Sequence, residues 1–422
     1  MRTELAINGR TDATGRYVTW SPSASQVRLS DSAGATGPVA VRLRNRNPLS
    51  GGQVVFLADL SQTPRTELQL ILPVNGSAVQ FFIAGQFGKP SRDDGDATVE
   101  VVTATTNEVL GSTPLMVRIR KNANMLSPGE RNRFRSALAT LNNRGMGRFS
   151  DFRKVHGPEG YYEEHERAGF LPWHRAFILD LERELQAIDP SVTLPYWKFD
   201  EPAPNLFDPE FMGAADPNDI SGTVRFSAAN PLQFFTTDGT PGVIRSARFN
   251  TRTQAANVRG DNATLLLGGQ AQLFASFRRM EINPHGSAHT SFGGFIRDPT
   301  TAAKDPLFFL LHTNVDRLWA RWQWLHGRFD VASTSSYQFL GRAGSVGATR
   351  VGHNLLDTMW PWNGATGGER PPIAPGGPFP ATAAAAAPGP APDVRAMIDF
   401  QGLKTAASRL GFDYDDVPYQ PG

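Results

Sequence analysis

Short apolar runs, each ended by polar residues, recur along the first 120 residues of the chain. The runs are rich in Val, Leu, Ile, Phe and Thr, and Gly, Pro, Asp, Asn or Ser stands between most of them. They are VAVRLRN, QVVFLADL, TELQLILPV, AVQFFIAG, ATVEVVTA and PLMVRIRK. This spacing predicts an antiparallel β-sandwich, and we assign an all-β domain to residues 1–121.

The pattern changes at Ser127. A Ser-Pro pair with Glu130 three residues after Ser127 opens a segment of helical periodicity, as a capping box does. Helical segments then alternate with loops rich in Gly, Pro and Asn, which predicts a mainly α domain over residues 122–422 with function in its loops. The Pro- and Ala-rich segment 371–392 is interpreted as a low-complexity surface loop of this domain.

The eight histidines are unevenly distributed. Three lie within the segment 156–174 and three within the segment 285–312. His285 and His289 are four residues apart, so a helix would place both rings on one face. His174 and His312 lie in helical stretches that can each bring a third ring to a cluster. We therefore expect two sites of three neutral imidazoles, made by His156, His165 and His174 and by His285, His289 and His312.

The composition of the chain limits which metals and which classes of substrate it can bind. Three neutral imidazoles suit copper or zinc, and ligand type alone does not choose between them. The chain has no cysteine, which excludes thiolate metal sites, disulfides and cysteine nucleophiles. A net charge of +2 gives no field that favours nucleic acid, so a small-molecule substrate is expected. The N-terminal residues lack the pattern of an export signal and no long apolar span occurs, so we expect a cytoplasmic protein with no membrane partner.

Four segments resemble the two copper motifs of the tyrosinase, catechol oxidase (polyphenol oxidase) and molluscan haemocyanin family. They are FLPWHR, LPYW, HGSAH followed by FGG, and DPLFFLLHTNVDRLWARWQ. The resemblance covers about residues 125–330, and LGFDYDD is similar to the tyrosine-bearing signature that closes the family's catalytic domain. It implies a four-helix bundle that holds two copper ions through the two histidine triads, with O2 as co-substrate. The implied reaction oxidises o-diphenols to o-quinones, and some members also hydroxylate monophenols.

The resemblance also implies roles for residues beside the histidines. Phe308 corresponds to a phenylalanine that packs on a ligand ring, and Asn314 and Asp316 to a polar pair behind the ligands. Glu281 stands where the family often has a glutamate that orients a water and helps deprotonate a phenol. Gly286 occupies a position that is often Asn in members that hydroxylate monophenols well, which implies a weak monophenolase activity here.

The loop after His289 is expected at the mouth of the site. By alignment with the family, apolar side chains there would sandwich an aromatic substrate, and Arg297 would attract a carboxylated phenol. The residues assigned to substrate binding are Phe292, Phe295, Ile296, Arg297 and Pro299.

Other readings of the same residues remain open. An o-aminophenol oxidase would use the same site, and a haemocyanin-like oxygen carrier would share both motifs. A zinc hydrolase would use one triad and leave the other unexplained, and a silent β-domain protein would use the helical part as a scaffold. His326 and His353 are interpreted as structural.

Overall fold

The computed structural model describes residues 1–46, 49–166, 168–215, 222–341, 350–382, 385 and 387–419. The chain forms two compact units. The first comprises Met1–Ile119, Thr382–Ala387 and Gln401–Gly422, and the second comprises Arg120–Ala381 and Pro388–Phe400. These units depart from the expected domains 1–121 and 122–422, because two C-terminal segments group with the β-rich unit.

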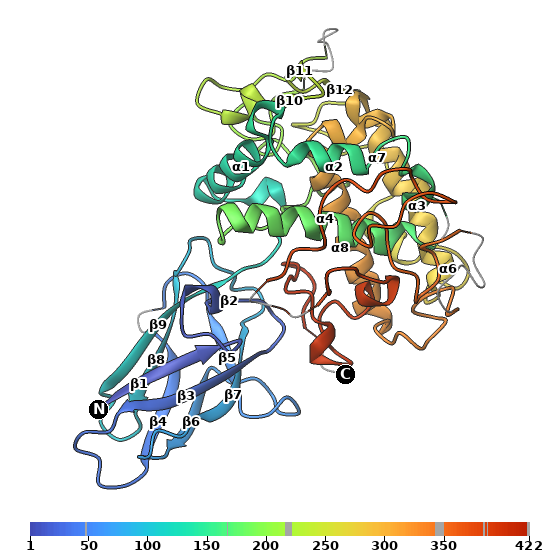
Figure 1. Cartoon of the computed structure of the whole chain (residues 1–422). Helices are drawn as coiled ribbons and strands as arrows, with labels where there is room; N and C mark the ends of the chain where they lie inside the picture. The colour runs from blue at the N-terminus through green and yellow to red at the C-terminus, as the bar shows by residue number, and fades with distance from the viewer. Residues whose placement is uncertain are drawn as a thin grey trace. The chain divides into compact units, whose positions relative to one another are not determined.

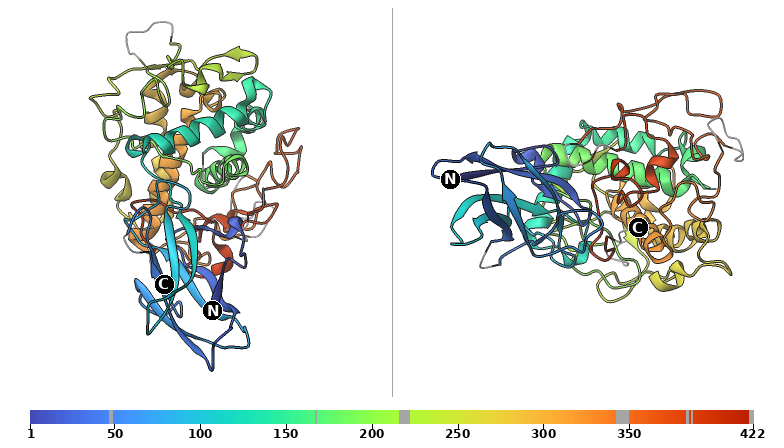
Figure 2. Two further views of the ribbon diagram at one scale, coloured as in Figure 1. Left: turned by 90° about the vertical axis from the view of Figure 1, so that its left-hand side faces the viewer. Right: turned by 90° about the horizontal axis from the view of Figure 1, so that it is seen from below.

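The first unit is built from two β-sheets (Figures 1 and 2). One sheet has the order β1-β3-β7-β5, and the other has the order β2-β9-β8-β4-β6. All pairings are antiparallel except that of β2 with β9. The strands are β1 (Arg2–Ile7), β2 (Tyr17–Val18), β3 (Ser23–Asp31), β4 (Val39–Asn45), β5 (Val54–Leu57), β6 (Glu67–Leu72), β7 (Val79–Gly85), β8 (Ala97–Thr103) and β9 (Val109–Val117).

Alternating side chains from both sheets form one buried core, which is the arrangement of a β-sandwich. On β3, Val27 and Leu29 are buried while Arg28 between them is exposed. On the other sheet, Val41 and Leu43 of β4 belong to the same apolar cluster. The apolar runs named in the sequence analysis therefore form strands, whereas β1, β2 and β3 were not expected.

The C-terminal segment is tied to the β-rich unit by buried hydrogen bonds. The indole Nε1 of Trp20 donates to the carbonyl of Tyr414 at 2.8 Å. The backbone N–H of Ser21 donates to Oδ2 of Asp413 at 3.1 Å. The tyrosine-bearing signature LGFDYDD thus packs within the first unit, and the expectation that it closes the helical domain is corrected.

The second unit is mainly helical. Ser127 and Glu130 form the predicted capping box at the start of α1. The α-helices are α1 (Pro128–Asn142), α2 (Phe149–Val155), α3 (Tyr161–Glu164), α4 (Phe170–Ile188), α5 (Asp261–Leu265), α6 (Phe274–Phe277), α7 (Ser287–Thr290) and α8 (Leu307–His326). Two short hairpins pair β10 (Thr236–Thr237) with β11 (Thr240–Pro241) and β12 (Arg245–Ala247) with β13 (Phe292–Gly294).

Short helical turns connect these elements. The 3-10 turns of both units are Ala13–Gly15, Ala123–Met125, Asn143–Gly145, Pro231–Phe234, Arg278–Glu281, Phe295–Arg297, Ala302–Lys304, Val394–Met397 and Ala406–Ser408. A π-helical turn, Ile282–Gly286, leads into α7. No helix in the described ranges has the length and apolar character needed to cross a membrane.

The long helices α4 and α8 pack against each other at the centre of the second unit (Figure 1). Both are buried on almost every side, and a buried ion-pair network joins them. Asp316 on α8 accepts from Nε of Arg175 on α4 at 2.5 Å and from Nη1 of Arg120 at 3.1 Å. Glu182 on α4 accepts from Nη2 of Arg120 at 2.6 Å.

The low-complexity segment 371–392 has anchors within its second-unit part. Phe379 is buried and its ring lies 5.7 Å from that of Trp362. The carbonyl of Pro380 accepts from Nη1 of Arg183 at 2.7 Å. The expected surface loop is therefore packed at these positions, while residues 383, 384 and 386 lie outside the described residues.

Candidate metal centre

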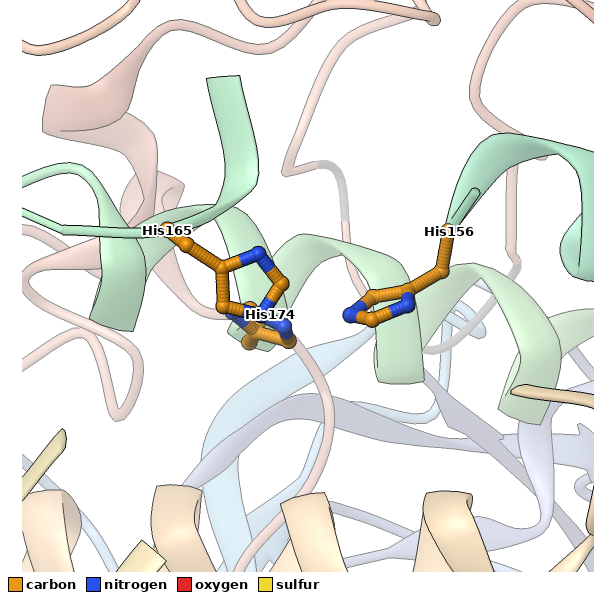
Figure 3. A group of neighbouring side chains, drawn as sticks. All are labelled: His156, His165 and His174. Carbon is orange, nitrogen blue, oxygen red and sulfur yellow. The ribbon is translucent and has the colours of Figure 1, made fainter. Parts of the chain in front are cut away.

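The first histidine triad is collected from the ends of two short helices and the interior of a long one. His156 follows α2, His165 follows α3, and His174 lies within α4. The ring of His156 lies 4.9 Å from that of His165 and 5.5 Å from that of His174, and the remaining pair is 5.2 Å apart. Figure 3 shows the three rings gathered in one group, with Nε2 of His156 pointing toward the other two. All three side chains are buried.

The second triad has the same compactness. His285 lies in the π-helical turn, His289 in α7 and His312 in α8. The ring centroids are 4.7 Å (His285 to His289), 4.9 Å (His285 to His312) and 5.4 Å (His289 to His312) apart. His285 and His289 were expected on a single helix. The structure instead places them on a π-helical turn and the short α7 that follows, and their rings still meet.

The two triads adjoin each other. The rings of His174 and His312 are 4.2 Å apart, and those of His165 and His285 are 6.5 Å apart. Within each triad, one ring nitrogen per histidine lies within 4.8 Å of those of the other two. The six imidazoles therefore form one buried cluster in which each half offers three donor atoms that could hold a metal ion.

Backbone carbonyls fix the orientation of three of these rings. Nδ1–H of His174 donates to the carbonyl of Phe170 at 2.9 Å. Nδ1–H of His285 donates to the carbonyl of Glu281 at 2.7 Å. Nδ1–H of His289 donates to the carbonyl of Ile296 at 2.6 Å. Because Nδ1 carries the proton, Nε2 keeps its lone pair for a metal.

Several ring nitrogens of the cluster are buried without a hydrogen-bond partner. They are both nitrogens of His156, Nδ1 of His165, Nε2 of His174, Nε2 of His285 and Nδ1 of His312. A buried polar atom without a partner is costly unless something binds it. Neutral nitrogen donors in two groups of three therefore fit a pair of copper or zinc ions.

Burial also keeps the imidazoles neutral. Desolvation lowers the pKa of His156 to about 3 and that of His289 to about 4. It lowers the pKa well below the ordinary range in His165, His174, His285 and His312. Neighbouring imidazoles lower the pKa of each of these four histidines further. A neutral imidazole is the form that binds a metal.

The predicted residues behind the ligands are all buried. Phe308 packs on both triads, since its ring lies 4.2 Å from that of His312 and 4.5 Å from that of His156. Asn314 accepts from Nη1 of Arg317 at 2.9 Å. Asp316 belongs to the ion-pair network of Arg175 and Arg120. Asp316 thus helps to join the helices that carry His174 and His312.

Glu281 links the two halves of the centre. Its carbonyl holds His285, and its Oε1 accepts from the backbone N–H of Glu166, the residue after His165, at 2.6 Å. Burial raises the pKa of Glu281 to about 7. Gly286 has an ordinary helical backbone, and a Cβ there would meet only the carbonyl of Glu281, at 3.5 Å.

The loop after His289 is partly exposed. Arg297 and Pro299 are exposed, Phe295 is half-buried, and the carbonyl of Ile296 holds His289. Phe292 differs from the expectation of a position at the mouth. It is fully buried in β13, where its ring packs against those of Trp197, Phe207 and Phe249.

Two residues near the first triad were not expected. Arg350 donates through Nη1 to the carbonyl of His165 at 3.2 Å and through Nη2 to Glu166 at 3.2 Å, so it clamps the loop that carries a ligand. Glu164 is fully buried beside the triad, and burial raises its pKa well above the ordinary value. The acidic pair directly before His165 was a visible signal for Glu164, whereas nothing in the sequence marks Arg350.

The part of the chain that carries the two triads is similar to tyrosinases. Residues 146–325 match the family model described as the common central domain of tyrosinase. The tyrosinase of Streptomyces antibioticus is 30% identical over 272 residues, which span 59% of this chain and 94% of that protein. The tyrosinase of Streptomyces glaucescens is 31% identical over 269 residues, which span 58% and 92%. A solved mutant polyphenol oxidase from Thermothelomyces thermophila aligns with a TM-score of 0.46 and 19% identity, over 70% of this chain and 88% of that one.

Proposed function

This chain belongs to the tyrosinase family of copper oxidoreductases, and from that premise we propose that it oxidises o-diphenols to o-quinones with O2. The supporting observation is the pair of adjoining, buried imidazole triads with unpartnered ring nitrogens. Two o-diphenols and one O2 give two o-quinones and two waters, so each diphenol loses two electrons and two protons.

The six histidines would hold two copper ions, one in each triad. When bound, the copper pair supplies electron transfer from the phenolic substrate to O2. The protein keeps the donors neutral by burial and turns three of them with backbone carbonyls. We further propose that α2, α4, α7 and α8 act together as the four-helix support of the centre, since they carry or adjoin five of the six ligands.

Glu281 is the proposed proton acceptor for the substrate hydroxyl. Its Oε1 already accepts from the N–H of Glu166, which leaves Oε2 for a water or a phenol. A carboxyl with a pKa of about 7 can both take and release a proton near neutral pH. Because the carbonyl of Glu281 accepts a hydrogen bond from His285, the backbone of Glu281 is held next to the second triad.

The exposed part of the loop after β13 is the proposed approach for the substrate. Phe295 and Pro299 offer apolar surface beside the carbonyl that holds His289, and Arg297 offers a positive charge. We expect Arg297→Ala to raise the KM for a carboxylated catechol and to leave that for catechol unchanged. Equal KM changes for both substrates would remove Arg297 from the proposal.

The reaction is tested by oxygen uptake of copper-loaded protein with catechol and, in parallel, with a monophenol. We expect rapid uptake with catechol and little with the monophenol, because Gly286 replaces the Asn of good monophenolases. Consumption of the monophenol after a short lag would instead assign a full tyrosinase activity. Reversible O2 binding without uptake on either substrate would contradict the oxidase and favour an oxygen carrier.

A further inference from the structure

A carboxylate that the proposed mechanism does not use lies against the first triad. Glu164 is the last residue of α3 and its side chain is 1% exposed. Its Oε2 lies 3.6 Å from Nε2 of His156 and 3.6 Å from Nδ1 of His165. One carboxylate oxygen is thus equidistant from two rings of the same metal site.

The protein supplies no other partner for this carboxylate in the part of the chain that the structure describes. Neither Oε1 nor Oε2 of Glu164 has a hydrogen-bond donor. An ionised carboxylate is strongly disfavoured where it is buried without a partner. A cation held by the adjacent triad is the charge that would offset this cost.

The backbone is shaped to admit the carboxylate. A Cβ at Gly160 would lie 1.8 Å from Oε1 of Glu164 and 2.4 Å from the carbonyl of Val155, the residue before His156. A side chain at position 160 would therefore displace either Glu164 or the backbone of Val155, which leads to His156. Only glycine leaves the carboxylate room at this place.

The preceding residue of α3, Glu163, is a buried glutamate whose charge is paired with an arginine. Glu163 is also buried, but its Oε1 accepts from Nη2 of Arg370 at 3.2 Å and from the backbone N–H of Trp360 at 3.1 Å. Two consecutive buried glutamates thus differ in their partners: Glu163 has an arginine, and Glu164 has two metal-site imidazoles.

We propose that Glu164 is a positioning residue of the first copper site. Its Oε2 lies 3.6 Å from Nδ1 of His165, where it would accept from Nδ1–H once the ring turns Nε2 to an ion. A carboxylate charge at this place would favour Cu(II) over Cu(I) in this triad. A carboxylate behind a ligating imidazole raises the basicity of the ligand and fixes its tautomer. The inference rests on the proposed function only in requiring that the triad bind copper.

Copper affinities measured in single-site variants test this role. His289→Asn leaves the first triad as the only complete site, and His174→Asn leaves the second. Into each we place Glu164→Gln, which keeps the shape and removes the charge, and Glu163→Gln as the matched control. Cu(II) and Cu(I) affinities are then measured on the apoprotein by competition with a chelator for each oxidation state.

In the His289→Asn background, Glu164→Gln is expected to weaken Cu(II) binding by roughly 10- to 100-fold and Cu(I) binding by less. It should leave the copper affinity of the His174→Asn protein unchanged. Glu163→Gln should lower the melting temperature with copper affinity unchanged in both backgrounds. If Glu164→Gln does not fold, Glu164→Asp, which retracts the charge by about one C–C bond, is expected to show a smaller loss with the same Cu(II) preference.

Equal copper affinities with and without the Glu164 substitution would overturn the proposal while leaving the oxidase intact. Equal losses of Cu(II) and Cu(I) affinity would do the same, since they indicate a packing effect. A wild-type protein that binds no copper would overturn the proposed function itself, and this inference with it.

Discussion

The imidazole rings of His174 and His312 stack with their centroids 4.2 Å apart and their planes 10° from parallel. One ring comes from each triad, and the two belong to α4 and α8. On the same two helices, the residue after His174 and the residue four positions after His312 form the ion pair of Arg175 with Asp316. The spacing between the two metal sites is therefore set by the packing of two long buried helices.

Loss of one ligand should remove one copper ion and the activity. His312→Asn is expected to bind a single copper per chain and to lower catechol oxidation at least ~100-fold, because the second site keeps only two imidazoles. The matched control is His326→Asn at the end of the same helix, where the ring lies 3.4 Å from the carbonyl of Leu265. Retention of two tightly bound ions by His312→Asn would contradict the ligand assignment.

The phenyl ring of Phe308 should be important to both stability and metal retention. Phe308→Ala leaves a cavity against rings of both triads and is expected to cost about 3–5 kcal/mol of unfolding free energy. Phe308→Leu should cost less, because it keeps more of the volume. Urea unfolding measures both, with the half-exposed Phe234→Ala as a surface control expected within about 0.5 kcal/mol of wild type. Equal effects at positions 308 and 234 would refute the packing role.

The buried charge network should not tolerate the loss of its shared acid. Asp316→Asn leaves Arg175 and Arg120 buried without their common carboxylate and is expected to destabilise the protein by about 3–5 kcal/mol. Asp151→Asn breaks the partly exposed pair with Arg148 and should cost about 1 kcal/mol or less. Thermal unfolding of the two variants under the same conditions makes the comparison, and a mild Asp316→Asn phenotype would rule out the network as a clamp.

Stability should fall as the pH rises through the pKa of Asp180. Burial raises this pKa from the ordinary 3.8 to about 7, and Oδ2 accepts from Nε1 of Trp362 at 2.7 Å. The folded state therefore holds a proton that the unfolded state releases between about pH 4 and pH 7. This contribution is complete below the lower value and is lost toward the upper one, with a slope of up to about 1.4 kcal/mol per pH unit.

The pH effect is tested with Asp180→Asn, whose side-chain oxygen can still accept from Trp362. Unfolding free energies at pH 5 and pH 7 should decrease less for this variant than for the wild type. Parallel decreases in both proteins would show that Asp180 does not titrate as expected.

Gly286 should control the balance between the two phenolic reactions. A Cβ at this position meets only the carbonyl of Glu281 at 3.5 Å, so Gly286→Asn is expected to fold normally. We expect the ratio of monophenol to catechol turnover to rise on the order of tenfold, which corresponds to about 1.4 kcal/mol in the relative barriers. Gly286→Ala is the control without the amide, and an equal rise in both variants would assign the effect to bulk.

Local sequence signals predicted what depends on local structure. The capping box at Ser127 and the alternation in the strand Val39–Asn45 appear where they were expected. The spacing of four residues predicted that His285 lies beside His289, and their rings are 4.7 Å apart although a π-helical turn carries His285. The strand Ser23–Asp31 was missed because its buried face begins with serines rather than with large apolar residues.

Features that depend on distant contacts could not be predicted. The bond from Trp20 to Tyr414 joins residues 394 positions apart, so the grouping of the C-terminal segment with the β-rich unit has no local signal. Phe292 is buried because β13 pairs with β12, which the loop sequence did not reveal. Glu164 was overlooked because a glutamate beside a histidine is ordinarily solvated.

The central claim is that two copper ions, one in each triad, work as a unit. The most direct measurement is oxygen uptake with catechol as the apoprotein is titrated with copper. We predict that uptake rises until two copper ions are bound per chain and then stays constant, and that zinc does not replace copper. Full activity at one copper per chain, or with zinc alone, would contradict the account.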